Sequence, residues 1–161
     1  MNKKQFYYQV FFYFVLWLIL FNFAPALAVE KCIMCGMDAC KSETKFTVQL
    51  EKGTKGIKAG KYSFCCLRCL IFFETRLKKK GKMGTIFVRD YNTVSEAYDS
   101  GEMFKAKQGF YLIESKLRPK ESMVPFMLIF SSKKTAIKYK KIYGGKIYDW
   151  EKAYNYTKTY K

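Results

Sequence analysis

The sequence contains no histidine among its 161 residues. Imidazole is the most common nitrogen ligand for transition metals in proteins and the usual side chain that titrates near neutral pH. Its absence argues against a catalytic zinc site or a Cu(II) site, since both generally use imidazole. Any metal that this chain binds must therefore be held by cysteine, methionine, carboxylate or backbone groups.

Acidic residues are also scarce, because 13 Asp and Glu side chains face 30 Lys and Arg side chains, a net charge of +17. The basic residues are spread along the whole main body as far as residue 161. A nucleic-acid site would gather them in a stripe with interleaved aromatic side chains, so no nucleic-acid partner is expected. General solubility explains the charge, and a weak attraction to an anionic membrane surface is the alternative.

The N-terminal segment has the pattern of an export signal. Lys3 and Lys4 precede an almost wholly apolar run over residues 5–23, and an A-x-A motif ends at Ala28. This pattern predicts a signal peptide at 1–28 that is cleaved after Ala28. A retained membrane anchor is the alternative, since the run approaches the ~20 residues of a spanning helix. Cys32 is not preceded by the small apolar residues of a lipid-attachment site. In either case the remainder is expected in the periplasm, or anchored and facing it.

The periodicity of the main body predicts an α+β fold made of two strand-strand-helix-strand repeats. The first repeat is expected as strands 45–50 and 61–64, helix 65–79 and strand 85–90. The second is expected as strands 109–115 and 126–130, helix 132–143 and strand 146–150. A connecting helix is predicted at 93–103. The first repeat is expected to span 29–92 and the second 93–151, and a loose polar tail is expected at 152–161. Each half has too small a core to be stable alone, so the two should pack as one unit.

Two pairs of cysteines are spaced as ligands would be. Cys32 and Cys35 form a C-x-x-C hook, and Gly36 permits the positive φ that a tight turn requires. Cys65 and Cys69 are four residues apart, which places both on one face of the expected helix. They lie at its N-terminus, where the pKa of a thiol is lowered and metal binding is favoured.

The spacing alone leaves several cysteine chemistries open. The six cysteines allow 15 disulfide pairings, and metal and disulfide chemistry are about equally supported. A Cys32–Cys35 disulfide would close a very short loop, where its stabilisation is smallest, so this pair suits a redox or a ligand role better. Cys66 is predicted to be a core residue, because it shares a helical apolar stripe with Leu70 and Phe73.

Several motifs together carry a family resemblance. They are Cys35-Gly36-Met37, Val88-Arg89-Asp90, the strand at 110–115, Met123, and the segment from Phe130 to Ile147. In this order and spacing the chain resembles the NosL family, the copper-binding accessory proteins for nitrous oxide reductase assembly, over about residues 32–151. Residues 62–69 also resemble the heavy-metal-binding half of TRASH-type domains. The family fold is the same pair of strand-strand-helix-strand repeats.

The resemblance implies a metallochaperone that binds Cu(I), with Cys35, Met37 and Met123 matching the family's sulfur ligands. The predicted metal set is Cys32, Cys35, Met37, Cys65, Cys69 and Met123, with Cys66 as an additional cysteine. The implied partner is a copper-donating or copper-accepting protein such as nitrous oxide reductase, and membrane association would run through the N-terminal segment.

Two other functions stay open. One is a thiol-disulfide redox protein that acts through Cys32 and Cys35, and the other is a structural zinc module that mediates interactions. No enzyme is expected, because the sequence has no Cys/His pair and no phosphate-cradling glycine loop. The chain departs from the family pattern in lacking histidine and a lipid-attachment cysteine, and in its extra thiols at Cys65, Cys66 and Cys69.

Overall fold

The computed structural model describes residues 30–78, 80–94 and 101–160. The first half contains β1 (Phe46–Lys52), β2 (Gly60–Phe64), α2 (Leu67–Arg76), β3 (Lys82–Arg89), η1 (Tyr91–Thr93), β4 (Met103–Lys105) and η2 (Ala106–Gln108). The second half contains β5 (Phe110–Ile113), β6 (Met127–Phe130), α3 (Lys133–Tyr143), β7 (Lys146–Tyr148) and α4 (Trp150–Thr159). Within these ranges no helix is both long and apolar enough to cross a bilayer. The predicted signal segment lies outside them.

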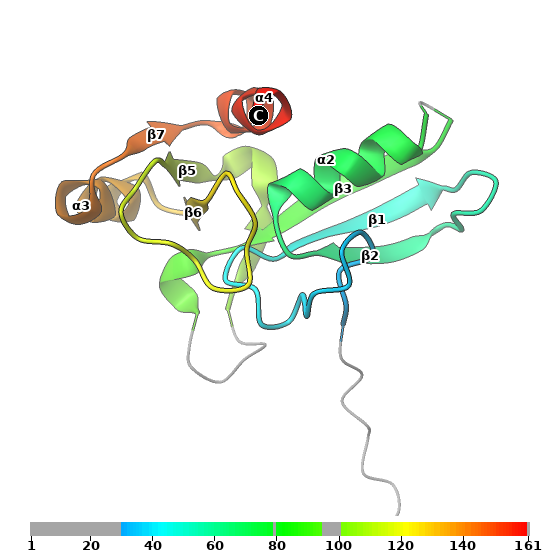
Figure 1. The fold of residues 1–161 in the computed structure, drawn as a ribbon, viewed down its shortest axis with the longest axis horizontal. Coiled ribbons are helices and arrows are strands. Elements are labelled where there is room, and N and C mark those ends of the chain that lie inside the picture. The colour runs from blue at the N-terminus through cyan, green and yellow to red at the C-terminus, as the bar shows by residue number, and fades with distance from the viewer. Residues whose placement is uncertain (1–29, 79, 95–100, 161) are drawn as a thin grey trace, which may run out of the picture.

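The two halves share one topology, as Figure 1 shows. In the first sheet β1 lies between β2 and β3, and all three pair antiparallel, while β4 extends the edge beyond β3. In the second sheet β5 lies in the same way between β6 and β7. Each half also carries its helix between the second and third strands. The predicted α+β fold with two strand-strand-helix-strand repeats is confirmed.

The second sheet joins the halves because both of its faces are buried. Leu112 and Leu128 turn toward α3 and pack around Ala136. Their neighbours Tyr111 and Ile129 turn the other way, into the main core that β1 and α2 build. Alternating side chains of a strand point to opposite faces, so one short sheet serves two apolar clusters. Neither half therefore encloses its core alone.

A hydrogen bond network at the end of β3 also connects the halves. The buried carboxylate of Asp90 accepts hydrogen bonds from the backbone N–H and the hydroxyl of Ser131, which follows β6. Its other oxygen accepts from the N–H of Asn92 at 3.0 Å and begins the turn of η1. Hydrogen bonds to a buried carboxylate are stronger than neutral ones, so this link helps to set how the halves meet.

The prediction of a loose polar tail at 152–161 was wrong for residues 152–159, which belong to α4 (Trp150–Thr159), and residue 161 lies outside the described residues. The Asp149 carboxylate caps the helix by accepting from the N–H of Lys152 at 2.9 Å. Trp150 and Ala153 then face the core, and the Trp150 ring lies 5.9 Å from that of Tyr111, centroid to centroid. Tyrosines make this helix polar in composition but amphipathic in arrangement. The predicted strand at 146–150 accordingly ends at residue 148.

The connecting helix predicted at 93–103 is also corrected. Thr93 ends the short helix η1, and Met103 begins the edge strand β4, which pairs antiparallel with β3. Residues 95–100 of this prediction lie outside the described residues. The helical prediction failed because the free edge of β3 offers backbone hydrogen bonds to a passing strand, and these do not depend on the local apolar period.

Candidate metal centre

The first thiol pair lies in a tight loop that closes on itself. The N–H of Cys32 donates to the carbonyl of Met37 at 2.7 Å, and the N–H of Gly36 donates to the carbonyl of Cys32 at 2.9 Å. Gly36 has a φ of 77°, the left-handed conformation that the spacing predicted. The N–H of Ile33 donates to the carbonyl of Ser63 and so holds the loop against β2. As a result the Cys32 side chain is buried, whereas that of Cys35 is exposed.

The second thiol pair lies at the junction of β2 and α2. Cys65 and Cys66 follow the last residue of β2, and α2 begins at Leu67. Cys66 occupies the N-cap position and Cys69 lies in the first helical turn. The predicted helix start at residue 65 is therefore shifted, because Cys66 has extended dihedral angles. The Cys65 and Cys69 sulfurs approach to 3.7 Å, but the prediction that both lie on one face of the helix was wrong, because Cys65 precedes the helix.

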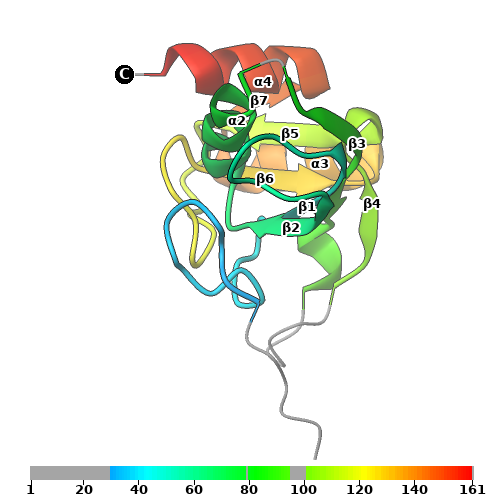
Figure 2. The same cartoon turned by 90° about the vertical axis from the view of Figure 1, so that its right-hand side faces the viewer.

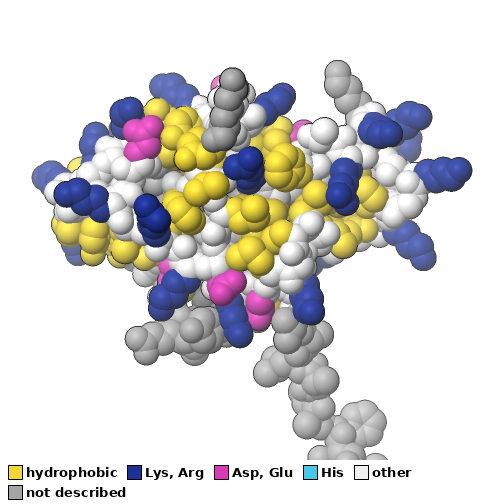
Figure 3. All heavy atoms as spheres, viewed as in Figure 1, with side chains coloured by type: hydrophobic (Ala, Val, Ile, Leu, Met, Phe, Trp, Pro, Cys, Tyr) yellow, Lys and Arg dark blue, Asp and Glu magenta, His cyan; other side chains and the backbone are white. Residues whose placement is uncertain are grey.

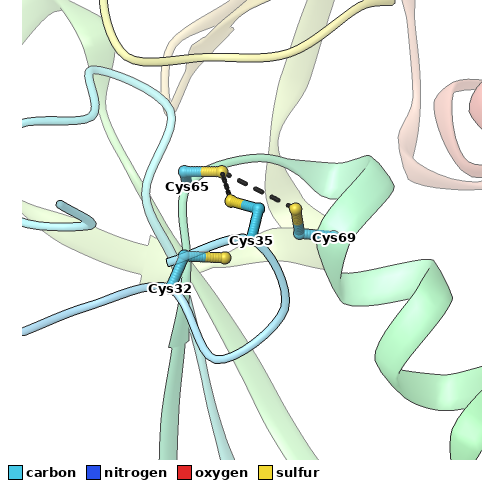
Figure 4. A group of neighbouring side chains, drawn as sticks. All are labelled: Cys32, Cys35, Cys65 and Cys69. Atoms are coloured by element: carbon cyan, nitrogen blue, oxygen red, sulfur yellow. Dashed lines mark hydrogen bonds between the residues drawn. The ribbon is translucent and has the colours of Figure 1, made fainter. Parts of the chain in front are cut away.

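The fold brings the two pairs together into one group. The four sulfurs of Cys32, Cys35, Cys65 and Cys69 all lie within 4.8 Å of one another (Figure 4). Cys65 Sγ is 3.5 Å from Cys35 Sγ, across 30 residues of sequence. Four thiolates arranged tetrahedrally at a metal–sulfur distance of about 2.3 Å would be about 3.8 Å apart. The group therefore has the size of a thiolate metal site, and we call it the four-thiol group.

Met123 approaches the four-thiol group from the other half of the chain. Its Sδ lies 3.8 Å from Cys69 Sγ, although 54 residues separate them in sequence. The Met123 loop passes beside the N-terminal loop near the start of α2, as Figure 2 shows. The Arg68 guanidinium donates to the carbonyl of Val124, and Glu43 accepts from the N–H of Lys120. These contacts position Met123 independently of its own side chain.

Two hydroxyl groups fix the turn that carries the second thiol pair. The carbonyl of Cys65 accepts hydrogen bonds from Ser42 Oγ at 2.5 Å and from Thr44 Oγ1 at 2.8 Å. Thr44 Oγ1 is also hydrogen-bonded to Ser122 Oγ at 2.9 Å, next to Met123. One side chain thereby ties the cysteine turn to the methionine loop. The sequence signalled none of these hydroxyl roles, because they depend on contacts between distant segments.

The remaining sulfurs have different surroundings. Met37 is half-buried and packs against the main core, and its carbonyl closes the first loop, but no contact of its sulfur with the four-thiol group is recorded among the described residues. Cys66 is 3 % exposed, in accord with its predicted core position, but its Sγ also lies 3.8 Å from Cys65 Sγ. Cys40 lies outside the group, with its sulfur 4.0 Å from the Lys45 ammonium. All six cysteines are described and are free thiols.

Close contact between the thiols lowers the pKa of some of them and raises the pKa of others. Hydrogen bonds from Cys65 and Cys69 hold the pKa of Cys32 far below its ordinary range. The same two side chains, with backbone N–H groups including that of Met123, lower the pKa of Cys66 to about 3. The pKa of Cys65 is raised, mainly by its contacts with Cys32 and Cys66. The lowered pKa values of Cys32 and Cys66 favour the thiolate form that metal binding requires.

The NosL family model matches residues 25–155. The chain belongs to the NosL family. The fold also resembles the crystal structure of the copper chaperone NosL from Shewanella denitrificans, with a TM-score of 0.55 and 22 % identity. That match covers 79 % of this chain and 93 % of the other. No curated protein matches the sequence.

The NosL family assignment agrees with the order of motifs that the sequence shows. The donor set of this member is wholly sulfur: four thiols within 4.8 Å of one another and a thioether 3.8 Å from one of them. Thiolates and thioethers select soft ions such as Cu(I), whereas hard ions such as Mg²⁺ prefer oxygen ligands. The arrangement therefore favours a soft metal ion over hard ions.

Proposed function

We propose that this NosL family member is an extracytoplasmic Cu(I)-binding metallochaperone. Cys32, Cys35, Cys65 and Cys69 supply the thiolates, and Met123 supplies a thioether. The proposed role is to carry the ion and hand it on, so it is a binding role rather than a catalytic one. Copper is the cargo of the protein and not a resident cofactor.

The position of Met123 carries this proposal. Its thioether lies 3.8 Å from the Cys69 sulfur, at the edge of the four-thiol group. Zinc sites use cysteine, histidine and carboxylate ligands, whereas Cu(I) also accepts methionine. A structural zinc module would need the four thiols alone. A redox protein would need only the Cys32–Cys35 pair, so the convergence of a third and a fourth thiol and a thioether favours Cu(I).

The surface around the site suits transfer to a partner protein. Cys35 is the one exposed member of the four-thiol group, so an incoming ligand can reach the ion there first. Large apolar side chains beside the ligands are exposed as well: Ile33 is 51 % exposed, Phe72 is 47 % and Val124 is 40 %. Exposed apolar residues that adjoin a site are typical of docking surfaces. We infer that a copper-exchanging protein docks on this rim.

The location and the recipient form part of the same proposal. The basic start, apolar run and A-x-A motif of residues 1–28 support export to the periplasm, with retention as an anchor as the alternative. The family resemblance supports a cuproenzyme such as nitrous oxide reductase as the recipient. Lys and Arg side chains are dispersed over the face shown in Figure 3, which offers no basic stripe for nucleic acid there.

The proposal is tested by metal competition under anaerobic conditions. The chain starting at Val29 is purified with reduced thiols, and its affinities for Cu(I) and Zn²⁺ are measured against chromophoric chelators. We expect Cu(I) to be bound and to withstand an excess of Zn²⁺. Cys69→Ser should weaken Cu(I) binding, because its sulfur faces both Cys65 and Met123. Cys40→Ser is the matched control, since Cys40 lies outside the group, and should bind as the unaltered protein does.

Each alternative function gives its own result. Stoichiometric zinc that Cu(I) does not displace would overturn the proposal in favour of a structural zinc module. Absence of metal together with a Cys32–Cys35 disulfide, after reduction and reoxidation, would overturn it in favour of a redox protein. If Cys69→Ser and Cys40→Ser bound Cu(I) with the same affinity, the four-thiol group would not be the Cu(I) site.

A further inference from the structure

The outward face of α3 carries basic side chains with exposed apolar ones beside them. Lys134, Lys138 and Lys141 follow the spacing of one row along a helix, and all three are exposed. Two large apolar side chains flank the row, Ile137 at 40 % exposure and Ile142 at 62 %. The row and the two isoleucines line one open hollow on the surface. We call these five residues the α3 face.

The charge of this helix is of one sign. α3 contains five lysines and no Asp or Glu, whereas α2 contains Glu74 and α4 contains Glu151. Within the described part of the chain, none of the five lysines forms an ion pair. Their charge is therefore not neutralised locally, and the α3 face is complementary to an anionic surface.

We propose that the α3 face docks on a bilayer that contains anionic phospholipid. The lysine row meets the headgroup phosphates, while Ile137 and Ile142 enter the boundary between headgroups and acyl chains. Basic amphipathic helices that lie in the membrane interface combine these two attractions. A surface for single-stranded nucleic acid would instead offer aromatic side chains on which bases stack. This inference goes beyond the proposed copper function and does not depend on it.

Docking through α3 does not engage the metal centre. α3 packs on the face of the second sheet that carries Leu112 and Leu128. The opposite face of that sheet belongs to the main core, which includes Cys65 and Cys69. The sheet thus lies between α3 and the four-thiol group, and Figure 1 shows α3 at the outer end of the second half. A chain bound in this way keeps its four thiols free for metal exchange.

Vesicle binding tests the proposal. The chain starting at Val29, which contains every described element of the fold, is sedimented with two kinds of vesicle. One is pure phosphatidylcholine, and the other also contains phosphatidylglycerol. We expect binding to the second kind only. Replacing Lys134, Lys138 and Lys141 together with Gln should lower the partition coefficient about 100-fold, because each lysine at an anionic surface contributes about fivefold.

A matched control separates the α3 face from the total charge. Lys52, Lys55 and Lys58, at the end of β1 and in the loop after it, are also exposed, so Gln at these positions removes the same charge. This control should lose no more than about fivefold, since charges beyond a Debye length are screened. Ile142→Ser tests the apolar contact and should weaken binding about tenfold. Circular dichroism confirms that each variant keeps the fold.

Each contrary result has a definite meaning. Equal losses in the two lysine variants would overturn the α3 face, because binding would then follow net charge. Unchanged binding of Ile142→Ser would overturn the proposed contact with the interface. Failure to bind phosphatidylglycerol vesicles would overturn the proposal outright, and heparin binding that is lost in the α3 variant would then assign the face to a soluble polyanion. None of these measurements involves copper, so the proposed function is tested separately.

Discussion

Replacing Thr44 with valine tests whether the hydroxyl network holds the metal site together. Thr44 is fully buried, and its Oγ1 donates to the Cys65 carbonyl and is hydrogen-bonded to Ser122. Valine keeps the branched shape of the side chain but removes these two hydrogen bonds and a longer one, of 3.3 Å, between Thr44 Oγ1 and Ser42 Oγ. The substitution therefore separates the cysteine turn from the Met123 loop without leaving a cavity.

The size of the effect on stability follows from the hydrogen bonds that each former partner of Thr44 retains. A neutral hydrogen bond contributes about 0.5–1.5 kcal/mol. The Cys65 carbonyl keeps its bond from Ser42 Oγ at 2.5 Å, and the half-buried Ser122 can turn toward water. We therefore expect Thr44→Val to lower the free energy of unfolding by about 1–2 kcal/mol. For a chain of this size the melting temperature should fall by about 2–8 °C. Cu(I) affinity should fall by about tenfold, since positioning partners of ligands typically contribute that much.

Urea unfolding of the metal-free protein and Cu(I) competition measure the two effects separately, both under anaerobic conditions. Thr47→Val is the matched control, because Thr47 is also buried in this part of the chain but makes none of these contacts. The control should leave Cu(I) affinity unchanged. Lowered stability of Thr44→Val with unaltered Cu(I) affinity would refute the reasoning that this network positions the ligands. Unaltered stability would refute the assigned hydrogen bonds themselves.

Three further predictions concern single side chains. Met123→Leu should cost under about 1.5 kcal/mol in urea unfolding, while chelator competition shows weaker Cu(I) binding; unchanged affinity would leave an all-thiol site. Asp90→Ala should lower the free energy of unfolding by about 2–3 kcal/mol, because Ser131 loses a buried charged acceptor. A loss below about 1 kcal/mol would contradict this prediction. Burial, followed by Glu43, raises the pKa of Tyr91 to about 12. The folded state therefore keeps a proton that the unfolded chain loses near about pH 10, so stability should fall from about pH 10 to about pH 12. Tyr91→Phe should show a shallower fall in urea midpoint over that range, and an equal slope would rule out this contribution.

Much of the fold could be predicted because local periodicity coincided with the tertiary arrangement. Phe46, Val48 and Leu50 alternate as the sequence predicted, and all three are buried in β1. Gly36 adopts the positive φ that its place after the C-x-x-C hook required. The prediction failed where polar composition hid an amphipathic face, as in α4, whose core contacts begin at Trp150.

The sequence by itself determined the repeat pattern and which kinds of ligand the site could use. The absence of histidine excludes imidazole, and the paired spacing of Cys32, Cys35, Cys65 and Cys69 favours sulfur, because ligand type is a property of the residues and not of the fold. The repeated strand-strand-helix-strand order follows from apolar periods, which reflect local backbone geometry.

Only the tertiary structure decided which sulfurs meet. Met123 approaches Cys69 because the second sheet buries both of its faces and draws the loop before β6 against the start of α2. Met37, two residues from Cys35, packs against the same core, but within the described residues no sulfur contact joins it to the four-thiol group. Contacts between segments 54 residues apart depend on how the two halves pack, and no local pattern specifies that packing.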